Sequence, residues 1–284
     1  MNRQAIPTIA ELRRLGRQLL PGAEGAGEVE VLLAAASGRS RAWLRAHDDA
    51  VAEAGWLLRY RDWLERRAQG EPVAYLIGER EFWSLPLKVT AAVLIPRADT
   101  ETLVEQVLQR LPLRAGARLA DIGTGSGAVA LAVARERPQA QVVATDASSA
   151  ALAVARENAE RLGLAHVGFR LGDWYAALAG EARFDVIASN PPYIASIDRH
   201  LGEGDLRFEP ASALVSGRDG LDAIRVLVAD AATHLLPGGW LLLEHGFSQA
   251  PAVRALMQAA GLVETGSARD LGGHERVSYA RLRP

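Results

Sequence analysis

Hydrophobic residues in the first seventy positions recur at the spacing of helices. Thr8 and Glu11 form a capping-box pattern that begins one helix, and Pro21 and Gly22 end it. Further helical runs are predicted over residues 29–36, ending at Gly38, and from Asp48 or Asp49 to about Gly70. A small all-helical domain is therefore predicted over residues 1–72.

The pattern changes to short β-like runs between residues 75 and 90. Residues 79–83 and 85–89 predict two strands, and Pro86 lies near the turn between them. A hairpin at this place would connect two domains. Residues 73–95 are therefore predicted to be a β-hairpin linker.

Apolar strands alternate with amphipathic helices from residue 96 onward. Asp99 is placed to cap the first helix of this region. The strand candidates are residues 118–122, 141–145, 184–189 and 240–243, and the clearest helices are 128–137 and 149–162. This alternation predicts βαβ units and an α/β fold. The expected domain, residues 96–284, is a doubly wound, Rossmann-like parallel sheet with helices on both faces.

The composition fits a globular protein and excludes several classes. Of the 284 residues, 49% are hydrophobic and 23% are charged, which rules out a disordered or collagen-like chain. The most apolar stretch stops at Arg135, far short of the roughly 18 residues that a membrane-spanning helix needs. Arg13, Arg14 and Arg17 interrupt the N-terminal apolar pattern, so no signal peptide is predicted and a cytoplasmic location is expected.

Charge and metal-ligand residues narrow the chemistry further. The chain has no cysteine, and its six histidines show no ligand spacing, so no metal site is predicted. Its 32 basic and 34 acidic residues give a net charge of −2. This balance disfavours direct binding of nucleic acid.

A glycine-rich string stands where the strand at 118–122 meets the next helix. Glycines at such a junction let the backbone approach a ligand closely. The third glycine follows the second by two positions, unlike the dinucleotide fingerprint, and the Gly-Lys-Ser/Thr of a phosphate-binding loop is missing. The candidate cofactor-binding residues of this string are Asp121, Gly123, Thr124, Gly125, Ser126 and Gly127.

Residues after the next strands complete a nucleoside site. Asp146 ends the second strand, where its carboxylate can accept hydrogen bonds from both ribose hydroxyls of an adenosine. Asp173 can pair with the adenine amino group and Trp174 can cover the ring, although Trp174 alone is equally a packing residue. With the glycine string, these residues resemble the nucleoside-binding half of S-adenosylmethionine-dependent methyltransferases. Asp121 would either orient the amino group of the methionine moiety or only cap the loop.

Asn190, Pro191, Pro192 and Tyr193 follow the strand at 184–189 and form the candidate catalytic turn. A planar amino group is a poor nucleophile, because its lone pair is delocalised. The Asn190 side-chain oxygen and the Pro191 carbonyl can accept its two hydrogens and aim its nitrogen at a sulfonium methyl. Tyr193 can lie against the flat face of the substrate group. A simple strand-ending turn is the alternative, which the upstream cofactor string disfavours.

Together these motifs resemble the HemK/PrmC family, which methylates the side-chain amide nitrogen of the glutamine in the Gly-Gly-Gln motif of class-1 peptide chain release factors. The resemblance rests on residues 78–83, 95–101, 190–193, 207–210, 219–221, 243–246 and 275–277. Ala98 stands where the family commonly has a proline, a departure that removes no chemical group.

The resemblance implies a class I methyltransferase domain, with S-adenosyl-L-methionine as methyl donor and release factors as protein substrates. The cofactor would contact the glycine string, Asp146, Trp174 and Asn190, and the substrate glutamine would contact residues 190–193.

The resemblance and the sequence also indicate roles for other regions. The helical domain would help to engage the release factor, and the segment 195–217 would border the groove for the protein substrate. Glu79, Arg80 and Arg97 are expected to form interdomain ion pairs. A monomer is expected.

Two other functions stay open at this point. A DNA adenine or ribosomal RNA base methyltransferase would use the same turn on a nucleobase amino group, but the chain has one lysine, Lys88, and no basic recognition region. A non-catalytic adaptor that binds release factors or ribosomes is disfavoured, because the catalytic turn and the cofactor string are both intact.

Overall fold

A computed structural model describes residues 6–284. This described chain divides into two compact units, one ending at Gly78 and the other running from Glu79 to Pro284. The division into residues 1–72, 73–95 and 96–284 stays a prediction, and its first five residues lie outside the described ones. Each unit is described by itself.

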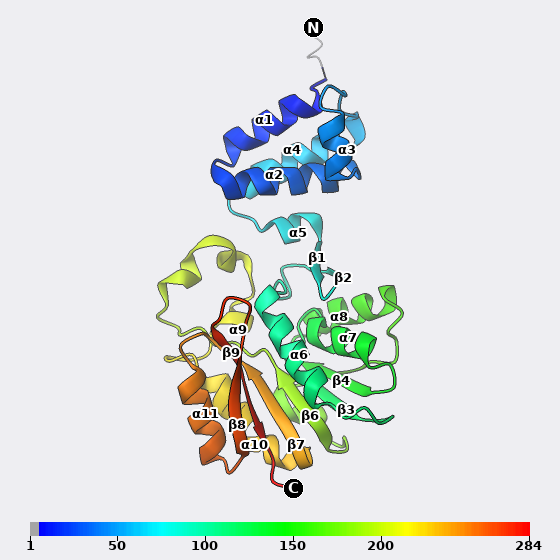
Figure 1. Ribbon diagram of the computed structural model, residues 1–284. Helices are drawn as coiled ribbons and strands as arrows, with labels where there is room; N and C mark the ends of the chain where they lie inside the picture. Colours follow the sequence, from blue (N-terminus) through cyan, green and yellow to red (C-terminus); the bar gives the residue numbers. More distant parts are fainter. Residues whose placement is uncertain (1–5) are drawn as a thin grey trace. The chain divides into compact units, whose positions relative to one another are not determined.

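The first unit is helical (Figure 1). Its helices are α1 (Ile9–Leu19), α2 (Gly22–Ser37), α3 (Arg41–Ala46), α4 (Ala54–Ala68) and α5 (Val73–Ile77). The predicted capping box is confirmed, because the Thr8 amide donates to Glu11 Oε2 at 2.9 Å and the Glu11 amide donates to Thr8 Oγ1 at 3.3 Å.

Two predicted helix starts were wrong. Helix α2 begins at Gly22, seven residues before the predicted start at residue 29. The sequence pattern missed this first part of the helix because its Gly- and Ala-rich residues show no apolar periodicity. Helix α4 begins at Ala54, not at Asp48 or Asp49. The Asp48 side chain instead pairs with Arg13, and Val51 forms a β-bridge with Thr8. A tertiary contact has therefore replaced the predicted cap.

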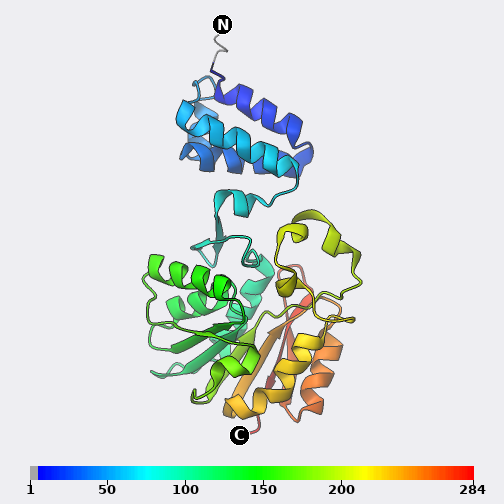
Figure 2. The ribbon, with the colours of Figure 1, turned by 180° about the vertical axis from the view of Figure 1, so that it is seen from behind.

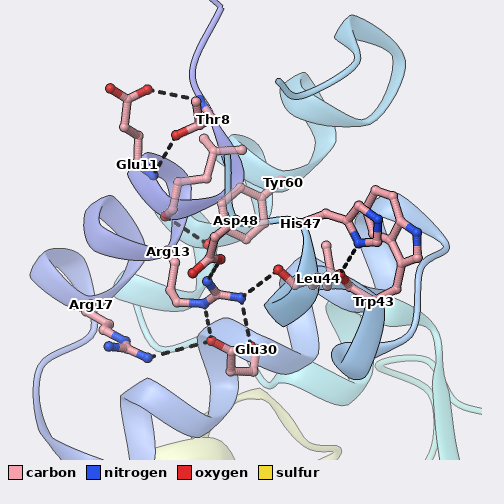
Figure 3. A network of polar contacts seen from close by, with 11 residues as sticks. Thr8, Glu11, Arg13, Arg17, Glu30, Trp43, Leu44, His47, Asp48 and Tyr60 are labelled. Carbon is pink, nitrogen blue, oxygen red and sulfur yellow. Dashed lines mark hydrogen bonds and ion pairs between the residues drawn. The ribbon is translucent and has the colours of Figure 1, made fainter. Parts of the chain in front are cut away.

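A buried polar network ties α1 to α2 and to the turn after α3 (Figure 3). Arg13, 8% exposed, donates through Nε to Glu30 Oε1 at 2.5 Å and also pairs with Asp48. The hydroxyl of the buried Tyr60 donates to the carbonyl of Leu12 at 3.2 Å. Because Arg13 is matched by two carboxylates, its charge is compensated inside the helical core.

The second unit begins with the predicted hairpin. Strands β1 (Glu79–Phe82) and β2 (Leu85–Lys88) pair antiparallel, with Phe82 opposite Leu85, as the sequence predicted. Phe82, Leu85 and Leu87 are buried in the core of this second unit.

A mixed sheet of seven strands lies within the described residues, in the order β5-β4-β3-β6-β7-β9-β8. Its strands are β3 (Arg118–Ile122), β4 (Gln141–Asp146), β5 (Gly168–Leu171), β6 (Phe184–Ser189), β7 (Leu235–Glu244), β8 (Val263–Arg269) and β9 (Glu275–Arg281). The predicted strands are confirmed, but a wholly parallel sheet was wrong, because β9 pairs antiparallel with β7 and with β8. These last two strands are rich in polar residues, which hid them from the apolar pattern.

Helices cover both faces of the sheet, as predicted (Figures 1 and 2). One face packs against α6 (Glu101–Arg110), α7 (Ala128–Glu136) and α8 (Ser149–Arg161), and the other against α10 (Asp222–His234) and α11 (Ala250–Ala259). Short helices complete the unit: η1 (Ala98–Thr100), η2 (Trp174–Leu178), η3 (Arg199–Gly202), η4 (Gly204–Phe208) and α9 (Ala211–Leu214). This is the doubly wound α/β architecture that the sequence predicts.

The strand order defines a switch point. Strands β3, β4 and β5 follow one another toward one edge, whereas β6 returns to the other side of β3. In sheets of this kind, ligands bind beyond the carboxyl ends of the strands at the switch point. No helix in residues 6–284 is both long enough and apolar enough to span a membrane.

Two glycines in the helical unit provide a matched stability test. A Cβ at Gly16 would lie 2.7 Å from Tyr60 Oη and 2.8 Å from Val29 methyl carbons, whereas one at Gly27 would meet nothing within 4 Å. We expect Gly16→Ala to lower the free energy of unfolding by about 1–3 kcal/mol through overpacking. Gly27→Ala should raise it by about 0.5–1 kcal/mol. Urea unfolding of both full-length variants measures this, and equal stabilities would contradict the close packing of α1 on α2.

Candidate functional site

The carboxyl ends of β3, β4 and β6 border a cavity of about 590 Å³. All the predicted site residues line it except Gly127 and Tyr193. The lining members are Asp121, Gly123, Thr124, Gly125, Ser126, Asp146, Asp173, Trp174, Asn190, Pro191 and Pro192. Four chain segments, which follow β3, β4, β5 and β6, therefore meet at the switch point.

The glycine loop after β3 takes backbone conformations that favour glycine. Gly123, Gly125 and Gly127 have φ values of 75°, 56° and 87°. The amides of Gly123 and Thr124 donate to the carbonyl of Thr145 at 2.9 and 2.8 Å, which ties the loop to β4. Gly127 immediately precedes α7, and a Cβ there would lie 3.0 Å from Leu131; its contact with a cofactor stays a prediction.

Asp121 is buried beneath this loop. Its Oδ2 accepts hydrogen bonds from the Thr124 hydroxyl at 2.6 Å and from the Ala130 amide at 3.1 Å. Burial raises the pKa of Asp121 to about 6, against the lowering effect of these two donors. The sequence left two roles open for Asp121. The structure shows that Asp121 caps the loop. Its contact with the methionine moiety of a cofactor stays a prediction.

Asp146 holds the loop from the end of β4. Its Oδ2 accepts from the Gly125 amide at 2.9 Å and its Oδ1 accepts from the Ser148 amide at 2.8 Å. Each carboxylate oxygen has a further lone pair, so both oxygens can accept another hydrogen bond from a ligand in the cavity. Trp174, half-buried at φ 44°, packs against the core on the α10 side and also lines the cavity.

The catalytic turn begins at the end of β6. The hydroxyl of the fully buried Ser189 donates to the Ile122 carbonyl at 2.6 Å, so the ends of β6 and β3 are directly bonded. Asn190 Nδ2 donates to Thr100 Oγ1 at 3.1 Å. Its Oδ1 is buried and has no hydrogen-bond partner among the described residues. Asn190 lines the cavity, and its buried Oδ1 is an unsatisfied acceptor.

Tyr193 lies behind the cavity wall. Its hydroxyl donates to Glu244 Oε1 at 3.4 Å, and its carbonyl accepts from Gln249 Nε2 at 3.0 Å. Burial and the nearby Glu244 carboxylate raise the pKa of Tyr193. Its ring packs against the core on the α10 side, and its contact with a substrate stays a prediction.

Several residues of the site gave no usable signal in the sequence. Thr100 and Arg97 line the cavity, and Glu209 fixes its rim. The buried Glu209 carboxylate accepts from the Ile95 amide at 3.3 Å and pairs with Arg97 Nη2 at 2.8 Å. In the sequence, Glu209 and Glu244 could be recognised only as members of the family motifs. Thr100 could be recognised only as the residue that follows the capping Asp99.

The predicted interdomain ion pairs were wrong for Arg97 and Glu79. Arg97 pairs with Glu209, and Glu79 pairs with Arg161 at 2.8 Å, both within the second unit. The reason is that Glu209 lies on a segment that folds back over the cavity rim, a contact that sequence spacing does not reveal.

The segment 195–217 borders the cavity through Pro210, Ser212 and Ala213. It contains η3, η4 and α9, and a parallel bridge between Ile194 and Val215 closes its base. Its contact with a protein substrate stays a prediction. Among the described residues, no group of three or more His, Asp or Glu side chains could hold a metal ion.

The Arg97–Glu209 pair provides a stability test at the rim. The Glu209 side chain is fully buried while Arg97 is 37% exposed, and burial raises the pKa of Glu209. We expect Arg97→Ala to lower the free energy of unfolding by about 2 kcal/mol, because a buried carboxylate loses its partner. Arg225→Ala, which removes an exposed pair with Asp219, should change it by less than about 1 kcal/mol. Urea unfolding compares them, and equal effects would contradict a structural role for the rim pair.

Comparison with known proteins agrees with this geometry. Residues 11–78 match the model for the PrmC N-terminal domain, and residues 98–204 match the methyltransferase small domain. A crystal structure of a methyltransferase from Pyrococcus furiosus has a TM-score of 0.54 at 19% identity, covering 78% of this chain and 99% of that one, and shows a shared fold.

Close relatives extend over almost the whole chain. The release factor glutamine methyltransferase of Xylella fastidiosa is 58% identical over 254 residues, which cover 89% of this chain and 92% of that protein. The protein of the same name from Salmonella typhimurium is 48% identical over 257 residues, covering 90% of this chain and 92% of that protein. The resemblance seen in the motifs is confirmed: the chain belongs to the release factor glutamine methyltransferase family.

Proposed function

We propose that this protein transfers the methyl group of S-adenosyl-L-methionine to the side-chain amide nitrogen of the glutamine in the Gly-Gly-Gln motif of class-1 peptide chain release factors. The observation that carries the proposal is that Asn190, whose buried Oδ1 has no hydrogen-bond partner among the described residues, lines the same cavity as the glycine loop. A primary amide donates two hydrogens, and such an acceptor is what it requires. The names of the relatives supply the identity of the protein substrate.

The cavity suits the proposed cofactor. Its volume of about 590 Å³ is within the usual range for cofactor pockets. Asp146 would accept from the ribose hydroxyls, Asp173 from the adenine amino group, and Trp174 would cover the adenine. The loop residues Gly123 to Gly127, with Thr124 and Ser126, would surround the rest, above Asp121. When bound, S-adenosylmethionine supplies an electrophilic methyl group on its sulfonium sulfur.

The protein's own contribution is to hold the amide. Asn190 Oδ1 and the Pro191 carbonyl would each accept one amide hydrogen and keep the nitrogen lone pair directed into the cavity. The two consecutive prolines, Pro191 and Pro192, restrict the backbone so that both acceptors stay in place. The additional proton on the methylated nitrogen leaves to water. Tyr193 supports the turn from behind through Glu244.

The partners follow from the same assignment. Release factors are the proposed protein substrates, engaged by the helical domain and by the segment 195–217, and the three-part division at residues 72 and 95 is part of this proposal. The enzyme would work in the cytoplasm as a monomer, without membrane and without direct contact to nucleic acid.

We expect labelled S-adenosylmethionine to label purified release factor, but not the same factor with its Gly-Gly-Gln glutamine replaced. Asn190→Ala should lower the rate at least about a hundredfold, because the amide loses one of its two acceptors. The measurement is scintillation counting of the isolated factor, with DNA and ribosomal RNA in parallel reactions.

The two other functions are separated by the same experiment. Label in nucleic acid alone would support a base methyltransferase and contradict the protein substrate. Binding of the release factor with no label anywhere, unchanged by Asn190→Ala, would support a non-catalytic adaptor.

The cofactor assignment has its own test. We expect Asp146→Asn to raise the dissociation constant of S-adenosylmethionine by about tenfold, because a charged acceptor for the ribose becomes neutral. Asp185→Asn is the matched control, since that carboxylate binds Arg114 and the Arg118 amide and does not line the cavity. Isothermal titration calorimetry measures both, and equal affinities would contradict the ribose contact.

A further inference from the structure

One buried side chain of the second unit connects two segments that border the cavity. Asn158 lies on α8 and is fully buried. Its carboxamide contacts Lys88, the last residue of β2, and Ser126 of the glycine loop, which are 70 and 32 positions away along the chain. The proposed function gives Asn158 no role, although Asn158 touches the loop that would surround the cofactor.

The carboxamide of Asn158 has all its hydrogens engaged. Its Oδ1 accepts from the Lys88 amide at 2.7 Å, and its Nδ2 donates to the Lys88 carbonyl at 3.0 Å and to the Ser126 carbonyl at 2.9 Å. Rotation of the carboxamide by 180° would place its amino group against the Lys88 amide and its oxygen against two carbonyls. Only the observed orientation fits, so one side chain fixes backbone groups of two distant segments.

Lys88 stands shortly before a segment that forms one wall of the cavity. All residues from 91 to 97 except Ile95 line the cavity. The far end of this wall is fixed by Glu209, whose buried carboxylate accepts from the Ile95 amide at 3.3 Å. Its near end follows Lys88, whose amide and carbonyl are both bonded to Asn158. Side chains from distant parts of the chain therefore hold this wall at both ends.

Ser126 belongs to the opposite partner, the glycine loop, which also lines the cavity. Other contacts fix this loop to the sheet, because Asp146 Oδ2 accepts from the Gly125 amide at 2.9 Å and Asp121 Oδ2 accepts from the Thr124 hydroxyl at 2.6 Å. The bond to Asn158 has a different effect, since it ties the loop through one carboxamide to the segment that begins at Lys88. The separation of the two walls therefore depends on Asn158.

We propose that Asn158 is a positioning residue for the cofactor, which sets the separation between the glycine loop and the segment 91–97 and couples the end of β2 to occupancy of the cavity. A ligand that contacts both walls binds most tightly when they already have the right separation, because no free energy is then lost in ordering them. The inference rests on the proposed function for the identity of that ligand, S-adenosylmethionine.

The first test is the affinity of Asn158→Leu, which has nearly the same shape but makes none of these hydrogen bonds. We expect the dissociation constant of S-adenosylmethionine to rise about tenfold. The kcat at saturating cofactor should change less than about twofold, because Asn158 does not contact the catalytic turn. A general loss of stability would instead reduce the amount of active enzyme and leave the affinity of the folded fraction unchanged. Isothermal titration calorimetry and methylation kinetics measure the two quantities.

Two control variants accompany this measurement. Glu157→Gln removes the ion pair with the Lys88 ammonium at 2.6 Å but leaves the backbone of Lys88 bonded to Asn158. Ser278→Ala removes a buried hydroxyl that is bonded to His245 and does not line the cavity. Both should keep the affinity of the natural enzyme, although Ser278→Ala should lower the stability. An Asn158→Leu enzyme with the natural affinity would overturn the proposal.

The second test observes the coupling directly. Lys88 is the only lysine of the chain, so [α-¹⁵N]lysine labels one backbone amide, the one that donates to Asn158. We expect S-adenosylmethionine at about a hundred times its dissociation constant to slow the exchange of this amide with water by up to about a hundredfold. The reason is that opening of the bond also displaces the loop that holds the cofactor. Glu157→Gln should keep this response, and Asn158→Leu should lose it.

A second substitution covers the case in which Asn158→Leu does not fold. Asn158→Asp keeps the shape and the acceptor for the Lys88 amide, but it turns a carboxylate oxygen instead of a donor toward the Ser126 carbonyl. We expect it to raise the dissociation constant and to lose the exchange response as well. A Lys88 amide whose exchange is not slowed by S-adenosylmethionine, or is slowed equally in a folded Asn158 variant, would overturn the proposal.

These binding and exchange measurements need no release factor, which separates the inference from the proposed function. The expected coupling without any methylation of release factor would contradict the proposed function alone. Methylation of release factor together with the natural cofactor affinity in Asn158→Leu would contradict the inference alone. A natural enzyme that does not bind S-adenosylmethionine would contradict both.

Discussion

The direct bond between the ends of β3 and β6 is the constraint on which the site depends. The buried Ser189 hydroxyl donates to the Ile122 carbonyl at 2.6 Å, across the switch point of the sheet. The glycine loop starts directly after Ile122 and the catalytic turn directly after Ser189, so this bond fixes the two segments relative to each other. An electrophile held by one and a nucleophile held by the other must meet within a fraction of an ångström, and a rigid sheet edge can provide that accuracy.

The parts of the site that the sequence could predict are those encoded locally. Residues 121–127 and 190–193 each combine a strand end with glycines or prolines. The backbone conformations that these residues require can be recognised from the short sequence itself. Asp146 was predictable because the carboxyl ends of adjacent parallel strands lie at the same edge. The contact of Tyr193 with a substrate stays a prediction, and the sequence did not reveal that its hydroxyl donates to Glu244.

The parts that could not be predicted depend on contacts between distant segments. Thr100 and Asn190 are 90 positions apart, and Glu209 meets Ile95 from 114 positions away. No spacing rule links such residues, because their proximity results from the whole fold. The same limit applies to Asp48, which looked like a helix cap in the sequence but pairs with Arg13, 35 positions earlier. Strands β8 and β9 were not predicted, because their polar residues interrupt the apolar alternation.

Two buried carboxylates, Asp121 and Glu244, make the stability of the second unit depend on pH. The folded-state pKa values of Asp121 and Glu244 are raised to about 6 and about 7. Because these values lie above those of the unfolded chain, the folded state binds protons more tightly, and the contribution of both groups to stability falls as the pH rises from about 4 to 7. The apolar packing on both faces of the sheet must therefore stabilise the domain above about pH 7, where these two carboxylates favour folding least.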